Sequence, residues 1–374
     1  MLKYIKYFFP LSLVYILILS ILNGENYPTY FAILFSFFFI TGDYFISRDK
    51  KVQLYSFPKF LDLSIYLALP SLFLLIFLSV SVFSANNPQW YYNIIKNITG
   101  ADFINLKNSF NYIDKFSIIF MTVIIGGSMG ITAGHEMAHR KKNRFDTFVG
   151  NWLLALSFDC NFAIEHVYGH HKNVCLPEDP ASAKRGENIY LFILKAITRE
   201  HILGWKFELK RLNLKKLNFF NIQNRIIRGY SRSILISFLF FYFFGIMGLL
   251  TFLLIAFLSK VALESINYIE HYGLVRERGK PVRMRHSWNS NHFLSSIYLY
   301  NVTRHSDHHR NSSLKFWELS PIDKNAPMLP YGYLTMLYLV LFFPFLYKKI
   351  MKIELENWDK NYANEIERKL IKYV

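Results

Sequence analysis

The stretch that decides the fold is "SRSILISFLFFYFFGIMGLLTFLLIAFLSKVALESINY", residues 231–268. Apolar side chains fill it almost without interruption, although about 20 helical residues already cross the ~30 Å hydrocarbon layer of a bilayer. The stretch therefore has room for two helices. Gly245, which follows Phe244, offers the backbone freedom that a tight reversal between them needs. We expect membrane-spanning helices over 231–245 and 247–268.

Four other apolar blocks have the length of a membrane span. They cover about 7–22, 30–46, 61–83 and 116–133. No small-residue cleavage site follows the first block, so it is predicted to be a retained helix and not a signal peptide. The fold class predicted is an all-α integral membrane protein, a single domain over 1–374 with six transmembrane helices. Two shorter or interrupted blocks, 148–164 and 331–347, are expected to be interfacial or bundle-packed helices.

The charge balance is strongly basic, with a formal net charge of +17 in 374 residues of which 52% are hydrophobic. Such a charge fits nucleic-acid binding, an acidic partner or the cytoplasmic loops of a membrane protein. The apolar blocks favour the last, and no nucleic-acid partner is expected. The two cysteines, Cys160 and Cys175, form no CxxC pair, which argues against disulfides and thiolate-held metals. Both are predicted to be packing residues.

The cations also predict an orientation. If the N-terminus is inside, the loop after 30–46 with Arg48, Lys50 and Lys51 is cytoplasmic, as is the Lys- and Arg-rich segment 140–232. The loop 86–111 carries few cations and would be external. This asymmetry satisfies the positive-inside rule. It predicts that both termini lie in the cytoplasm; the membrane itself is expected to be a bacterial inner membrane.

Histidines gather in four short motifs. These are "GHEMAHR" (134–140), "EHVYGHHKNV" (165–174), "NYIEHYGL" (267–274) and "NVTRHSDHHRN" (301–311). They contain nine of the 12 histidines: His135, His139, His166, His170, His171, His271, His305, His308 and His309. In the predicted topology all four motifs lie at the inner membrane surface, within cytoplasmic segments 134–230 and 269–330 that form a histidine-rich helical cap. They can therefore share one site.

The spacing suggests how the histidines are used. On a helix, residues at i and i+4 share a face, which pairs His135 with His139, His166 with His170 and His305 with His309. Adjacent helical residues diverge by about 100°, so the neighbouring histidines of a motif suit two separate targets. Nine imidazoles exceed the capacity of one ion but fit two. Residue chemistry alone leaves the choice between iron and zinc open.

Carboxylates near the motifs could orient the ring nitrogens that do not bind metal. The candidates are Glu136, Glu165, Asp179, Glu270 and Asp307. No catalytic residue is predicted beyond the metal ligands. The other histidines, His201, His286 and His292, are expected to be structural.

Two other classes of protein compete with a two-metal enzyme. An HExxH motif is typical of zinc proteases, but such a protease leaves six clustered histidines unexplained. A metal transporter or sensor should have ionisable residues deep within its spans, and the predicted spans are nearly devoid of them.

The order HE-x-x-H-R, EH-x-x-GHH, NY-x-EHYGL and RHSDHH resembles the AlkB-type alkane 1-monooxygenases, which are related to membrane fatty-acid desaturases and to xylene monooxygenase. The segments "PEDPASAKRGEN" (177–188) and "HSWNSNHFLSSIYLYNVTRHSDHH" (286–309) also resemble that family, and the resemblance covers roughly 115–330. The chain differs at Val167-Tyr168, and at Cys175-Leu176, where the family would have Ala-Thr. These differences leave the substrate open.

The resemblance implies a non-haem centre of two iron ions (Fe2+/Fe3+) held by the nine histidines. It implies O2-dependent hydroxylation of the terminal or methyl carbon of an alkane-like substrate that enters from the bilayer lipid. The alternative is the same scaffold acting on an alkyl-aromatic or as a fatty acyl desaturase or hydroxylase. Electrons would come from a rubredoxin-type carrier and its reductase, because the chain has no flavin motif and no four-cysteine iron site.

Overall fold

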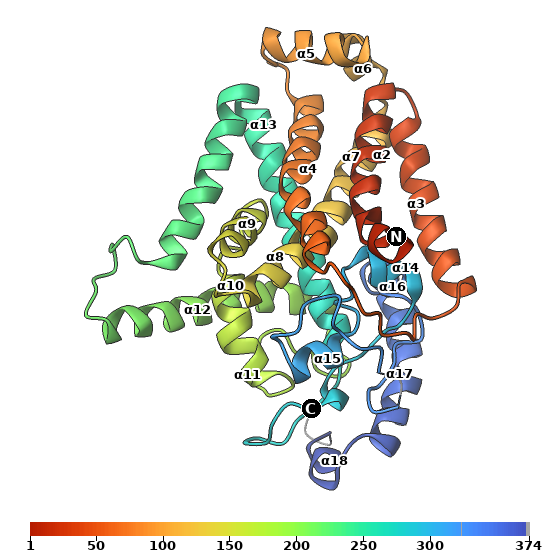
Figure 1. Cartoon of the computed structure of the whole chain (residues 1–374), viewed down its shortest axis with the longest axis vertical. Coiled ribbons are helices and arrows are strands. Elements are labelled where there is room, and N and C mark those ends of the chain that lie inside the picture. Colours follow the sequence, from red (N-terminus) through yellow and green to blue (C-terminus); the bar gives the residue numbers. More distant parts are fainter. Residues whose placement is uncertain (323, 372–374) are drawn as a thin grey trace.

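The computed structural model describes residues 1–322 and 324–371, and helices account for the regular structure of these residues. The extended pairing recorded among them is one isolated bridge between Asn289 and Met328. A bundle of long helices forms the upper half of the molecule, and the lower half consists of loops and short helices together with the longer α12 (Ile189–Leu214) and α17 (Pro344–Asn361) (Figure 1). The prediction of an all-α fold is confirmed in this coarse form.

The long helices correspond to the predicted apolar blocks. They are α2 (Phe9–Asn23), α3 (Tyr27–Phe45), α4 (Lys59–Phe83), α7 (Tyr112–Ile125), α8 (Ile131–His139) and α13 (Arg225–His271). A π-helical turn, Gly126–Gly130, joins α7 to α8 without a break. By length and composition four segments could cross a membrane: Lys3–Asn23, Lys59–Phe83, Tyr112–His139 and Arg225–His271. The block predicted at 30–46 forms α3, which is not among those four.

The decisive stretch forms a hairpin. α13 is broken at Gly245, whose φ of 65° and ψ of −163° lie outside the helical region. Such a conformation is essentially restricted to glycine. Figure 1 shows the two legs rising and descending side by side, which confirms the predicted reversal at Phe244-Gly245.

Short helices close both ends of the bundle. The connection 86–111 forms α5 (Gln89–Thr99) and α6 (Phe103–Ser109), which lie across the upper end (Figure 1). The lower part holds the remaining helices: α9 (Arg144–Ala155), α10 (Phe162–Glu165), α11 (His171–Asn173), α12 (Ile189–Leu214), α14 (Phe293–Tyr298), α15 (His305–Arg310), α16 (Tyr333–Phe342), α17 (Pro344–Asn361) and α18 (Glu365–Ile371). The block predicted at 148–164 is thus split between α9 and α10. The block at 331–347 is split before Pro344, which cannot continue the hydrogen-bonded ladder.

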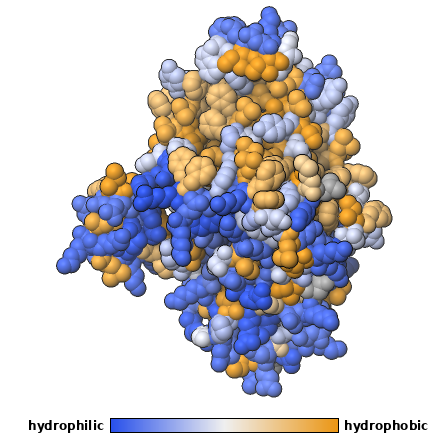
Figure 2. Space-filling model, in the orientation of Figure 1, coloured by the Kyte–Doolittle hydropathy of each residue, from blue (hydrophilic) through white to orange (hydrophobic). Residues whose placement is uncertain are grey.

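Polarity divides the molecule along the same line. Figure 2 shows apolar surface over the long helices and a mainly hydrophilic surface over the lower part. Small residues allow the helices that carry histidines to pack closely where the two parts meet. A Cβ at Gly150 of α9 would lie 2.6 Å from the Cβ of Met137 on α8, so glycine is required at this crossing. The contact holds α8, with its two histidines, against the cap.

Candidate metal centre

The four histidine motifs converge at the junction between the long helices and the lower cap. Their nine histidines form two groups, and the ligand-capable atoms within each group lie within 4.8 Å of one another. The first group is His135, His139, His166, His171 and His308; the second is His170, His271, His305 and His309. As the spacing predicted, the neighbours His170 and His171 face different groups, and so do His308 and His309.

The ring nitrogens within each group are close. In the first group, Nε2 of His308 lies 3.1 Å from Nε2 of His135 and 3.1 Å from Nε2 of His171. In the second, Nε2 of His305 lies 3.2 Å from Nε2 of His271 and 3.0 Å from Nε2 of His309. Neighbouring octahedral ligands with metal–nitrogen bonds of about 2.1 Å are about 3.0 Å apart. Both sets of nitrogens therefore have the spacing of ligands around one ion.

One predicted pair was wrong. His166 and His170 were expected to share a target, but His166 belongs with His171 and their Nε2 atoms are 3.1 Å apart. The reason is local: residues His166–His170 form a π-helical turn, in which i and i+5 come into register instead of i and i+4. The α-helical pairs, His135 with His139 and His305 with His309, are grouped as expected.

The donors suit a metal chemically. Nε2 of His139 is buried and has no hydrogen-bond partner, which is costly unless an ion satisfies it. Burial lowers the pKa values of His166, His171, His305 and His308 in the cap. Neutral imidazole is the form that binds metals. The histidines therefore fit the metal-bound role without a change of protonation.

Two of the five predicted carboxylates contact a histidine on its other nitrogen. Nδ1 of His170 is hydrogen-bonded to Oδ2 of Asp179 at 3.0 Å. Nδ1 of His305 lies 3.2 Å from Oε1 of Glu270, but not in hydrogen-bond geometry, and neither atom has another partner among the described residues. Burial acts to raise the pKa of Asp179, but the contact with His170 outweighs it and holds this pKa below its usual range. Asp179 is therefore an ionised acceptor able to orient the His170 ring.

The other three carboxylates have different surroundings. Glu136 pairs with Arg140 and accepts from the backbone of Phe316, while Asp307 pairs with Arg310 at 2.6 Å. Oε1 of Glu165 is buried without a hydrogen-bond partner, and burial raises the pKa of this carboxyl well above its ordinary value. None of the three has a hydrogen bond to a histidine among the described residues.

The three remaining histidines lie outside both groups, as expected. His286 nevertheless supports the centre, because its carbonyl oxygen is 3.0 Å from Nδ1 of His271. Its own ring contacts Glu367 through Nε2 at 2.8 Å. The thiol of Cys175 donates to the same His286 carbonyl, which agrees with a packing role for this cysteine.

A small cavity of about 30 Å³ adjoins both groups. Rings of the first group (His135, His166) and of the second (His305) line it. Most of the remaining wall is apolar, including Phe162, Leu263, Ile266 and Val302, and the polar side chains of Thr132, Asn267 and Glu270 complete it. Its volume is that of one or two small molecules or a methyl group. Histidines able to bind metal and apolar side chains therefore line the same small cavity.

A buried ionic network beside this centre was missed by sequence analysis. Nζ of Lys260 on α13 lies 3.0 Å from Asp159, 2.8 Å from Glu200 and 2.7 Å from Glu264, and all four side chains are almost fully buried. The expectation of spans nearly free of ionisable residues therefore needs correction. The available signal was a lysine within the decisive apolar stretch with a glutamate four residues later.

Comparison with known proteins assigns the family. Residues 116–340 match the family model described as fatty acid desaturase. The chain is 34% identical to alkane 1-monooxygenase 2 of Alcanivorax borkumensis over 72% of its own length and 71% of that protein. It is 37% identical to alkane 1-monooxygenase 1 of Pseudomonas aeruginosa, over 60% of the chain and 59% of the relative. It is 30% identical to the xylene/toluene monooxygenase hydroxylase component of Pseudomonas putida, over 66% of each.

Apolar helices with a histidine-rich centre at their ends, taken with these relatives, define a membrane non-haem di-iron oxidoreductase. The chain belongs to the fatty acid desaturase family and is similar within it to the alkane 1-monooxygenases.

Proposed function

We propose that the protein hydroxylates the terminal or methyl carbon of an alkane-like molecule, with O2 as the oxidant. The balanced reaction is R–H + O2 + 2 e⁻ + 2 H⁺ → R–OH + H2O. The observation that carries the proposal is the division of nine imidazoles into two groups, with a small, largely apolar cavity beside them that histidines of both groups line. The names of the relatives support the same reaction.

The chain's own residues would perform three tasks. His135, His139, His166, His171 and His308 would hold one iron, and His170, His271, His305 and His309 would hold the other. Bound there in reduced form, iron would supply the activation of O2. Asp179 and Glu270 would orient the His170 and His305 rings, and the apolar part of the cavity wall, formed by Leu263, Ile266 and Val302, would admit a hydrocarbon end and limit the access of water.

The membrane arrangement is part of the proposal. Six segments would cross the bacterial inner membrane, with α3 and the two legs of α13 counted separately, in a single domain. The centre and both termini would lie on the cytoplasmic side, because the cation-rich connections flank that end of the bundle.

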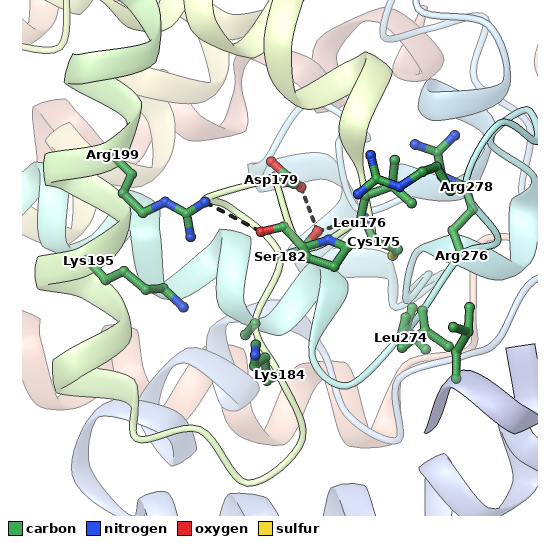
Figure 3. A pocket seen from close by; sticks show the side chains of 14 residues that line it. Cys175, Leu176, Asp179, Ser182, Lys184, Lys195, Arg199, Leu274, Arg276 and Arg278 are labelled. Carbon is green, nitrogen blue, oxygen red and sulfur yellow. Dashed lines mark hydrogen bonds between the residues drawn. The ribbon is translucent and has the colours of Figure 1, made fainter. Parts of the chain in front are cut away.

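A rubredoxin-type carrier, reduced by its reductase, would supply the electrons. A cavity of about 300 Å³ in the cap is lined by five cations, among them Lys184, Lys195 and Arg199 (Figure 3). Asp179 also lines this cavity and contacts His170, so a carrier docked here would face the second group across one side chain. Cationic surfaces attract acidic carriers and raise association rates.

Metal analysis is the first test. Purified protein should contain about two irons per chain, whereas a zinc protease would contain one zinc and would tolerate His305→Ala. Product analysis with reduced carrier, O2 and either octane or xylene then separates the candidates. Similarity to the xylene/toluene enzyme makes alkyl-aromatic hydroxylation the second candidate. Desaturation of a fatty acid without any hydroxylated product would refute both.

A further inference from the structure

One part of the molecule projects away from the bundle. The second half of α12 and the following loop, residues 201–224, extend sideways before α13 begins at Arg225 (Figure 1). We call this segment the lateral arm. The projection at the left of Figure 2 carries both apolar and hydrophilic surface.

Ion pairs and a helix cap give the lateral arm a defined conformation. Glu208, which is fully buried, pairs with Arg211 at 2.6 Å and with Arg225 at 2.7 Å, and so ties α12 to the start of α13. The Asn224 side chain accepts from the first backbone amides of α13 and donates to the carbonyl of Phe219 at 2.9 Å. These bonds fix the shape of the tip, while nearer the bundle Phe207 and Gly204 of the arm pack against Gly169 and Asn161.

Large apolar side chains at the tip face outward. Phe220 is 84% exposed, Ile222 83% and Leu214 78%. Phe219 stacks on Trp205 with ring centroids 5.3 Å apart, and Phe220 packs edge-on against Phe219. Exposed apolar side chains gathered in this way mark a surface that contacts another apolar phase.

Unpaired cations share the arm with these side chains. Lys206, Lys210, Lys215 and Lys216 are exposed, and none forms an ion pair with a carboxylate in the described part of the chain. Glu208 is the only acidic residue of the arm, and both arginines described above already use it. The arm therefore combines free positive charge with exposed aromatic and aliphatic groups, the composition of an interfacial membrane anchor.

The position of the lateral arm in the chain indicates that it contacts the membrane surface. The arm leads directly into the first leg of α13, which belongs to an apolar candidate span. The expected span begins at 231, so about two helical turns that carry Arg225, Arg228 and Arg232 separate the arm from the hydrocarbon layer, which puts the arm at the level of the lipid headgroups. Lysines at that level attract anionic headgroups, and Phe and Ile insert among the acyl chains.

We propose that the lateral arm lies in the membrane interface and binds anionic phospholipids, with Phe220 and Ile222 among the acyl chains and the four lysines on phosphate groups. This anchor would hold α12, which also bears Lys195 and Arg199 of the cap cavity, parallel to the bilayer. The inference goes beyond the proposed reaction and requires neither metal nor turnover.

Site-directed spin labelling of the full chain tests the depth of the arm. A nitroxide is placed at Phe220→Cys and, as the control, at Lys352→Cys on the exposed side of α17. The native Cys160 and Cys175 are buried. In vesicles of phosphatidylcholine and phosphatidylglycerol, the label at 220 should collide with O2 and be protected from a water-soluble nickel chelate, whereas the label at 352 should be open to the chelate.

Lipid selectivity is measured with spin-labelled phosphatidylglycerol and phosphatidylcholine added to the reconstituted protein. The wild-type chain should prefer the anionic lipid, and replacing the four lysines by Gln should lower that preference by up to about fivefold per lysine that contacts a headgroup. An unchanged preference overturns the proposal. So does a label at 220 that stays open to the chelate, or that becomes protected only when an acidic carrier protein is added.

Discussion

Replacing Lys260 by Met should destabilise the protein more than any exposed lysine replacement. The change removes the cation that contacts three buried carboxylates, those of Asp159, Glu200 and Glu264, at 2.7–3.0 Å. These carboxylates come from the α9–α10 turn, α12 and α13, so the ammonium joins three segments around the histidine centre. The side chain of Lys260 is only 6% exposed, so water cannot take its place.

The expected magnitude follows from that burial. Removing one partner from a buried ion pair costs about 3–5 kcal/mol, because the remaining charge is left uncompensated. Burial raises the pKa values of Asp159 and Glu200, so these groups can take up protons in the variant and limit the loss. An acid with a raised folded-state pKa loses stability as pH rises. The deficit should therefore be larger at mildly alkaline than at mildly acidic pH.

Thermal unfolding in detergent, followed at both pH values, measures the effect. For a chain of 374 residues, a loss of 3–5 kcal/mol corresponds to a fall in Tm of roughly 4–6 °C. Lys352→Met, an exposed replacement on α17, should shift stability by no more than about 0.5 kcal/mol. The double variant Lys260→Met/Glu264→Gln should recover part of the loss. Equal Tm values for Lys260→Met and Lys352→Met would refute the reasoning, since they would mean that the network is hydrated or replaceable.

Three other changes test the centre and the hairpin. Asp179→Asn should lower the affinity of the second group for iron about 10- to 100-fold, measured by competition with a chelator, because His170 loses its charged acceptor. His308→Ala should lower the iron content per chain, whereas His201→Ala, outside both groups, should leave it unchanged. Gly245→Ala should destabilise the hairpin by about 1–3 kcal/mol, seen as a lower Tm, since its backbone conformation strains any residue with a Cβ.

The long helices and the convergence of the histidines could be predicted from the sequence. Both depend on features that are local in the chain: the length of apolar blocks, a glycine at a turn and the spacing of histidines. A 47-residue apolar helix needs a break, and Gly245 was the residue able to provide it. The motifs could meet because the predicted spans put all four at one end. Adjacent imidazoles diverge on any helix, so His170 and His171 had to serve different targets.

The errors have equally specific causes. The pairing of His166 depends on a π-helical turn, a deviation of one residue per turn that hydrophobic periodicity does not reveal. Lys260 was passed over because its partners Asp159 and Glu200 are distant in sequence, and only tertiary structure brings them together. The partners of Glu136 and Asp307, by contrast, could have been read from the sequence: Arg140 and Arg310 follow them by four and three residues on the same helix and form ion pairs with them.

The length of the long helices explains why the centre forms where it does. The segment Tyr112–His139 has 28 residues, or about 42 Å of helix, and the second leg of α13, from Gly245 to His271, is of similar length at about 39 Å. Both exceed a hydrocarbon layer of ~30 Å by about two turns. α8 and α13 each carry their histidines on the last turns. The turns that extend beyond the hydrocarbon layer are therefore the turns that carry imidazoles, and they end at the same depth. The reversal at Gly245 therefore also sets the register at which His271 meets His170 and the α15 histidines His305 and His309.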